Sequence, residues 1–176
     1  MIVSREKREE VLRNAGVPQV FLEILKKVEK DEVLRFVIRE PENFYFSIDY
    51  FYPRDNFLKD YHIAPIFEDE DGHNFYVFLF NEKEQKFAAF SLEENELNSD
   101  YGASFDLMLA DLLIVLFQSS DDLSIQDWEV KGKEMGVEFA PRLFAQFISG
   151  HDFLDIYHEL GMEDRRIFLE EMIKSN

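Results

Sequence analysis

The chain has 176 residues, of which 46% are hydrophobic, and it contains no cysteine. Its length suits one domain with a sizeable buried core, and the lack of cysteine excludes disulfide bonds, cysteine-ligated zinc and thiol catalysis. The formal net charge of −18 disfavours binding to nucleic acid or to anionic lipid headgroups.

The first forty residues carry nine Lys or Arg and eight Asp or Glu, so this part of the chain is nearly neutral. Ser4 is a suitable N-cap for a helix that extends to about Ala15, and Gly16 favours the end of that helix. A second helix is predicted to begin at Pro18, because the apolar residues that follow it recur at helical spacing.

The chain then changes to short aromatic and β-branched segments separated by turn residues, the pattern typical of strands. We expect about five strands, at residues 34–38, 44–50, 63–67, 75–80 and 86–90. Asp71-Gly72 is a dipeptide that hairpin turns favour, and residues 81–85 form a second polar connection of ordinary hairpin length. These strands are therefore predicted to form an antiparallel meander.

The rest of the chain predicts helices. Residues 105–117 are apolar almost all round a helix, which is typical of a central buried element, and further helices are expected at 123–134, 141–148, 151–160 and 163–173. Strands grouped between two helical blocks favour an α+β fold. We predict a single domain over residues 1–176, with an antiparallel sheet between N-terminal helices and a C-terminal helical block, in which residues 120–176 are an extension.

Negative charge is concentrated between Glu68 and Asp122, where fourteen acidic residues accompany two basic ones. One interpretation is a solvated acidic surface. The other is a docking face for a basic protein, because a field of one sign steers oppositely charged partners toward the surface. The residues predicted to bind such a partner are Glu68, Asp69, Glu70 and Asp71 in the first hairpin connection, and Glu93, Glu94 and Glu96 farther along the chain.

An enzymatic alternative depends on two sets of residues. His151, Asp155 and His158 fall within one narrow arc of a predicted helix and could hold a metal, although the solvent side of an amphipathic helix shows the same pattern. Asp111 lies inside the most apolar helix and is the best candidate for a catalytic carboxylate. A hydrogen-bonded structural Asp is the simpler interpretation of that residue.

No metal or cofactor is expected. Residues 68–73 are rich in carboxylates, but if Gly72 took the sharp-turn position of an EF-hand loop, Phe67 and Phe78 would occupy two of its ligand positions. Glycine-rich phosphate loops, dinucleotide-binding motifs and Gly-x-Ser-x-Gly motifs are also missing from the chain.

The sequence favours a cytoplasmic protein. The N-terminus is charged where a signal peptide needs an apolar stretch. The longest apolar run, residues 107–117, is interrupted by Asp111 and is shorter than the roughly 20 residues that span a bilayer. The lack of cysteine fits a reducing compartment.

Several of these segments together resemble the SUKH superfamily, which includes bacterial immunity proteins and fungal cell-wall-synthesis regulators. The similar hallmark is a Pro-containing strand, a Gly turn and an apolar strand, followed by a helix that opens with an aromatic residue. In this chain it comprises Ile63-Ala-Pro-Ile66, the acidic turn ending in Gly72, residues 74–80, residues 87–90 and the helix at 105–117. The resemblance covers roughly residues 11–118 and implies a single α+β domain whose members often neutralise a toxin, such as a basic nuclease, by binding it.

The leading interpretation is a non-catalytic acidic binding domain, which the resemblance makes an immunity protein that neutralises a basic toxin. Two alternatives stay open. One is a small hydrolase or metal-dependent enzyme that uses His151, Asp155 and His158, or Asp111. The other is a regulatory or assembly protein.

Overall fold

The computed structural model describes residues 1–51, 57–91, 96–119, 123–148, 157 and 159–174. The chain forms two compact units, Met1–Ser104 and Phe105–Asn176. The fold is α+β, as the sequence predicts: an antiparallel sheet follows N-terminal helices and precedes a helical block. The boundary between the units lies before the long apolar helix and not near residue 120, and a single domain over the whole chain stays a prediction.

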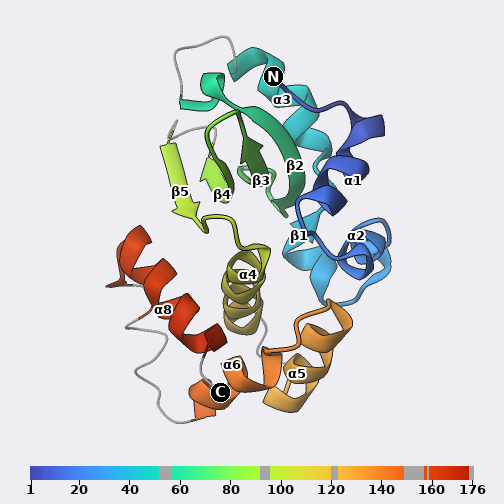
Figure 1. The fold of residues 1–176 in the computed structure, drawn as a ribbon. Helices are drawn as coiled ribbons and strands as arrows, with labels where there is room; N and C mark the ends of the chain where they lie inside the picture. The colour runs from blue at the N-terminus through green and yellow to red at the C-terminus, as the bar shows by residue number, and fades with distance from the viewer. Residues whose placement is uncertain (52–56, 92–95, 120–122, 149–156, 158, 175–176) are drawn as a thin grey trace. The chain divides into compact units, whose positions relative to one another are not determined.

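The first unit contains a five-stranded sheet in the order β1-β2-β3-β4-β5 (Figure 1). Its strands are β1 (Ile38–Arg39), β2 (His62–Asp69), β3 (Asn74–Phe80), β4 (Gln85–Ser91) and β5 (Glu96–Asp100). Every pairing is antiparallel, and both predicted hairpin connections are present. The predicted meander is confirmed.

The helices of this unit are α1 (Arg5–Asn14), α2 (Gln19–Leu25) and α3 (Glu42–Phe51), with 3-10 turns η1 (Val28–Lys30), η2 (Leu34–Phe36) and η3 (Phe57–Asp60). Ser4 and Pro18 occupy the N-cap positions of α1 and α2, although Ser4 makes no side-chain capping bond. Gly16 follows α1 with φ of 95°, a left-handed conformation that glycine adopts at little cost.

The strand predicted at residues 44–50 is wrong, because these residues form most of α3. Their apolar side chains alternate in sequence, but the structure buries Phe44 and Ile48 and leaves Phe46 79% exposed. Buried residues four positions apart lie on one side of a helix as well as on one face of a strand. The aromatic content of this segment led to the prediction of a strand, but the burial of Phe44 and Ile48 against the sheet stabilises a helix.

The strand predicted at residues 34–38 is mostly wrong as well. Leu34 begins the 3-10 turn η2, and only the two residues of β1 pair with β2. The Oδ1 atom of Asp31 accepts hydrogen bonds from the backbone N–H groups of Val33 and Leu34, at 3.0 and 2.9 Å. These local hydrogen bonds stabilise a turn, so the backbone does not form the hydrogen bonds of a paired β-strand here. The fifth strand is instead β5, whose polar sequence gave no strand signal.

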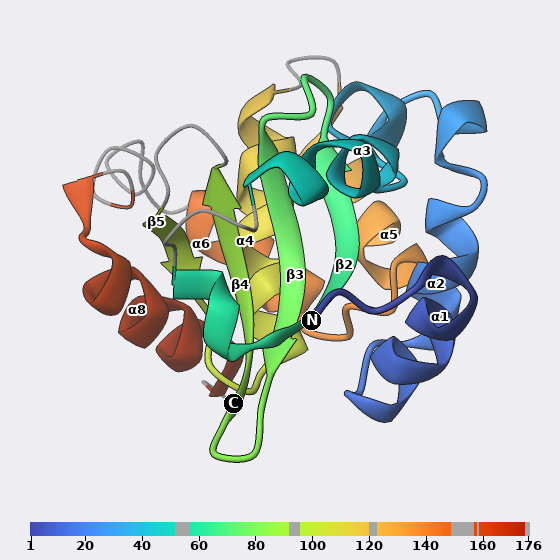
Figure 2. The same ribbon diagram turned by 90° about the horizontal axis from the view of Figure 1, so that it is seen from above.

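One face of the sheet packs against α3, which lies in front of β2 and β3 in Figure 2. The ring centroids of Phe44 and Phe75 are 5.5 Å apart in edge-on geometry. The hydrophobic cluster on this face consists of Phe44, Ile48, Leu58, Ile63, Phe75, Val77, Leu79, Ala88 and Phe90. This core positions the N-terminal end of α3 relative to the sheet.

The outer edge of β2 is covered along its length. The N-terminal segment pairs with Ile63. The backbone N–H of Ile63 donates to the carbonyl of Met1 at 2.9 Å, and the carbonyl of Ile63 accepts from the backbone N–H of Val3 at 2.8 Å. Arg8 donates to the carbonyl of Ile66 at 3.1 Å, and β1 pairs with the last residues of the strand. Free backbone groups at a sheet edge invite other chains, so these contacts protect the edge.

The second unit is helical, with α4 (Phe105–Ser119), α5 (Ile125–Glu134), α6 (Ala140–Ile148) and α8 (Met162–Lys174). Helix α8 packs against α4 and α6, and α5 packs against α6. Residues 107–114 of α4 are buried without interruption, as the apolar pattern predicts. The helix predicted at residues 151–160 lies mostly outside the described residues.

Among the described residues, no helix combines the length and the apolar character needed to cross a membrane.

Candidate functional site

The β2–β3 hairpin carries the first four residues predicted to bind a partner. It turns at Gly72, whose φ of 70° is in the left-handed region that favours glycine. The four acidic residues before this turn have different environments, so they do not form one solvated acidic loop.

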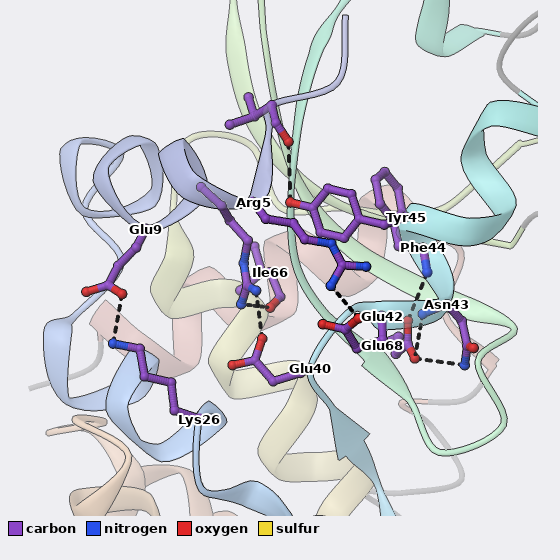
Figure 3. Close-up of polar contacts among 12 residues, drawn as sticks. Arg5, Glu9, Lys26, Glu40, Glu42, Asn43, Phe44, Tyr45, Ile66 and Glu68 are labelled. Carbon is purple, nitrogen blue, oxygen red and sulfur yellow. Dashed lines mark hydrogen bonds and ion pairs between the residues drawn. The ribbon is translucent and has the colours of Figure 1, made fainter.

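Glu68 is 1% exposed, so the expected exposure of this residue is wrong. Its carboxylate accepts hydrogen bonds from the backbone N–H groups of Asn43 and Phe44, at 3.3 and 3.1 Å, and from the Asn43 amide Nδ2 at 2.9 Å (Figure 3). The two backbone N–H groups belong to the first turn of α3, where no helical carbonyl is available to accept from them. Burial raises the pKa of the Glu68 carboxyl, and the N–H bonds oppose that effect.

Asp69 holds the turn from within. Its Oδ1 accepts from the N–H groups of His73 and Asn74, at 2.8 and 3.2 Å, and its Oδ2 accepts from the Asn74 side chain at 2.6 Å. Asp69 is therefore an organising residue of the hairpin, because its carboxylate replaces a backbone acceptor for these donors.

Glu70 and Asp71 are the two exposed acids of this hairpin. Glu70 pairs loosely with Arg39 at 3.5 Å, and both side chains are more than 40% exposed. Asp71 has no ion pair or hydrogen bond among the described residues. A weak exposed ion pair can exchange partners at little cost, so these two carboxylates are the ones accessible to another protein.

The hairpin touches the start of α3. A Cβ atom added to Gly72 would lie 2.5 Å from Nδ2 of Asn43, so the glycine backbone passes directly under this side chain. Since Asn43 also bonds to Glu68, the acidic hairpin and the first turn of α3 form one connected structure. Sequence analysis missed this junction because it predicted a strand in place of α3.

A series of ion pairs connects α1 with the end of α2, with Glu40 and with the first residue of α3 (Figure 3). Arg8 pairs with Glu40 at 2.6 Å, Lys26 pairs with Glu9 at 2.8 Å, and Arg5 pairs with Glu42. They border a cleft of about 190 Å³ lined by Arg5, Arg8, Glu9, Leu22, Lys26 and Glu40. Each cation of the lining already faces a carboxylate, so the cluster ties α1 to the end of α2, to Glu40 and to the first residue of α3.

The second set of predicted partner-binding residues is described only in part. Glu93 and Glu94 lie outside the described residues, and Glu96 is the first residue of β5. Partner binding by Glu93, Glu94 and Glu96 therefore stays a prediction.

The enzymatic alternative receives little support from Asp111. This residue is 5% exposed and accepts a hydrogen bond from the hydroxyl of Tyr157, which is itself buried. The guanidinium of Arg165 lies 4.9 Å from the Tyr157 ring centroid. A buried carboxylate that is already hydrogen-bonded links the segment at residue 157 to α4, which is a structural role.

The other candidates for catalysis, His151, Asp155 and His158, lie outside the described residues. Within the described part of the chain, no three or more His, Asp or Glu side chains are grouped so that they could hold a metal ion.

The chain matches no family model, no curated protein and no solved structure. The resemblance to the SUKH superfamily thus stays a prediction that depends on its motif alone, and the function has to be argued from the hairpin and its surroundings.

Proposed function

We propose that this protein is a non-catalytic binding module that takes a basic protein partner on the acidic surface of its sheet unit. The observation that carries the proposal is the pair of exposed carboxylates, Glu70 and Asp71, on a hairpin whose other two acids hold it in place. A preorganised charged surface loses little conformational entropy on binding.

The distribution of ion pairs supports this function. Cations of the N-terminal helices are paired internally, as Arg5, Arg8 and Lys26 illustrate. The region from Glu68 to Asp122 has too few cations for such pairing, with two Lys for fourteen acids. The excess negative charge favours fast, salt-sensitive association with a basic surface.

The more specific form of the proposal is an immunity protein that binds a basic toxin, such as a nuclease, and thereby neutralises it in the cytoplasm. It follows from the resemblance to the SUKH superfamily. Its test is growth: the captured partner should arrest growth of cells that express it alone, and co-expression of this protein should restore growth.

The binding function is tested by measuring association rates with a partner captured from the native cell extract. Reversal of Glu70, Asp71, Glu93 and Glu94 to Lys should slow association at least about tenfold, because local charge steers the encounter. The thermal melt should barely change, since exposed acids contribute little to stability. Glu68 and Asp69 are left intact because they hold the hairpin.

The matched control reverses the exposed acids Glu10, Glu29, Glu32 and Glu138 to Lys. Both variants have a net charge of −10 in place of −18. If both variants lose association rate equally, the effect comes from net charge and not from the hairpin. If the first variant loses none, the proposal of an acidic docking face is wrong.

A further inference from the structure

We propose that the exposed ring of Phe46 and the carboxylate of Asp71 form one recognition surface for an arginine side chain of the basic partner. This inference rests on the proposed binding function and assigns it a specific anchor. The occupant is a protein segment that presents arginine, since an aromatic ring beside a carboxylate complements a planar cation.

Among the residues of α3 whose side chains the structure describes, Phe46 is the most exposed large apolar one. The helix buries Phe44 and Ile48 against the sheet, and the Phe46 side chain is left 79% exposed. A Phe side chain left in water gives up the hydrophobic stabilisation that burial would supply. Aromatic side chains that are exposed on a protein surface often become anchors of protein interfaces.

The position of Phe46 relative to the hairpin follows from helix geometry. Phe46 is three residues after Asn43, so the two side chains are neighbours on the helix surface. Helical side chains lean toward the N-terminus, so we infer that the Phe46 ring leans toward the turn that contains Asn43. Asn43 in turn lies against Gly72, the residue after Asp71. Figure 2 shows α3 beside the end of the sheet where β2 turns into β3.

The two backbone segments that carry this surface are held in place. Glu68 bonds to the first turn of α3, and Asp69 bonds to the residues that follow Gly72. The ring and the carboxylate thus project from two elements, α3 and the hairpin, whose backbones are joined through the buried carboxylate of Glu68. A fixed geometry is what recognition of a rigid guanidinium needs.

The same helix contains an internal example of this chemistry. Arg5 pairs with Glu42, and its guanidinium carbon lies 4.6 Å from the ring centroid of Tyr45. A carboxylate and an aromatic ring of α3 thus already hold one arginine of the chain itself. Phe46 and Asp71 offer the same pair of groups, and among the described residues no cation lies over the Phe46 ring.

The probe for this inference is a fluorescently labelled nona-arginine peptide, with nona-lysine for comparison, measured by anisotropy at low salt. Phe46→Ala should weaken nona-arginine binding at least about fivefold and nona-lysine binding less, because arginine stacks on rings better than lysine does. Phe46→Trp should retain or strengthen binding. The control is Phe36→Ala, which removes another exposed aromatic ring, 55% exposed, that lies elsewhere in the sheet unit.

Equal effects of Phe46→Ala and Phe36→Ala, or none in either, would overturn the inference. A double variant that carries Glu70→Lys and Asp71→Lys separates this inference from the proposed function. If the reversal weakens binding and Phe46→Ala does not, the acidic surface stands and the anchor is wrong. If neither change weakens binding, both proposals fail. Unchanged thermal melts of the Phe46 variants show that the fold is intact.

Discussion

The role of Glu68 in the structure differs from the role that its sequence context predicts. In the sequence it is the first of four acids before a glycine, and it was predicted to face a partner. In the structure it is buried and holds the first turn of α3. Of the next two acids, Asp69 accepts hydrogen bonds within the turn, and Glu70 pairs with Arg39. Residue type alone could not separate these roles.

Because burial raises the pKa of Glu68, we expect its contribution to stability to depend on pH. The contribution is fully present below the unfolded pKa of about 4.3 and is lost as pH rises through the higher folded pKa. Urea unfolding at pH 4 to 7 should therefore show wild type losing stability relative to Glu68→Gln as pH rises. Glu70→Gln is the exposed control. A loss in the opposite direction would mean that the N–H bonds outweigh burial.

Gly72 is expected to tolerate no side chain. Gly72→Ala introduces a left-handed Ala, which costs about 1–2 kcal/mol. Its Cβ would also displace the Asn43 amide from Glu68, a further loss of about 1 kcal/mol. Gly16→Ala is the matched control, because φ is also positive there and nothing lies within 4 Å of an added Cβ. Chemical denaturation should show a larger loss at Gly72, and equal losses would contradict the junction with α3.

At the scale of elements, periodicity predicted some segments well and failed at others. The long apolar run of α4 and the hairpins around Gly72 and residues 81–85 have strong local signals, and all are present. Helix α3 was missed because a buried pair four residues apart fits a strand and a helix equally. β5 was missed because its polar residues depend on β4 for pairing. The position of Phe46 at the surface could be found only after α3 was known.

The pair α5 and α6 provides a test of packing against helix propensity. Gly132 lies in the last turn of α5, two residues before its end, and within a helix Ala is normally more stable than Gly by about 0.8–1.0 kcal/mol. An added Cβ would lie 2.4 Å from the Cβ of Ala140, which cannot rotate away. Overpacking costs about 1–3 kcal/mol, so Gly132→Ala should lower the free energy of unfolding. Lys133→Ala, at an exposed position of the same helix, should not lower it. A stabilised Gly132 variant would show that the helices are farther apart.

At the scale of the whole molecule, the net charge of −18 opposes folding through self-repulsion. Added salt shortens the screening length from roughly 30 Å at 0.01 M to about 10 Å at 0.1 M. The Tm should therefore rise by at least about 3 °C between these concentrations, corresponding to roughly 1 kcal/mol for a chain of this size. The charge-reduced control variant, at −10, should show a smaller rise. A Tm that falls with salt would mean that ion pairs such as Arg8–Glu40 dominate.

The sequence by itself determined the α+β class, the three central strands with their turns, the apolar helix α4 and the concentration of acid, because these are properties of neighbouring residues. The tertiary structure decided which acids are accessible, since Glu68 is covered by α3 from 24 residues earlier in the chain. It also made Phe46 an exposed neighbour of the hairpin through the contact of Asn43 with Gly72. Burial depends on residues far apart in the chain, and a local pattern does not contain that information.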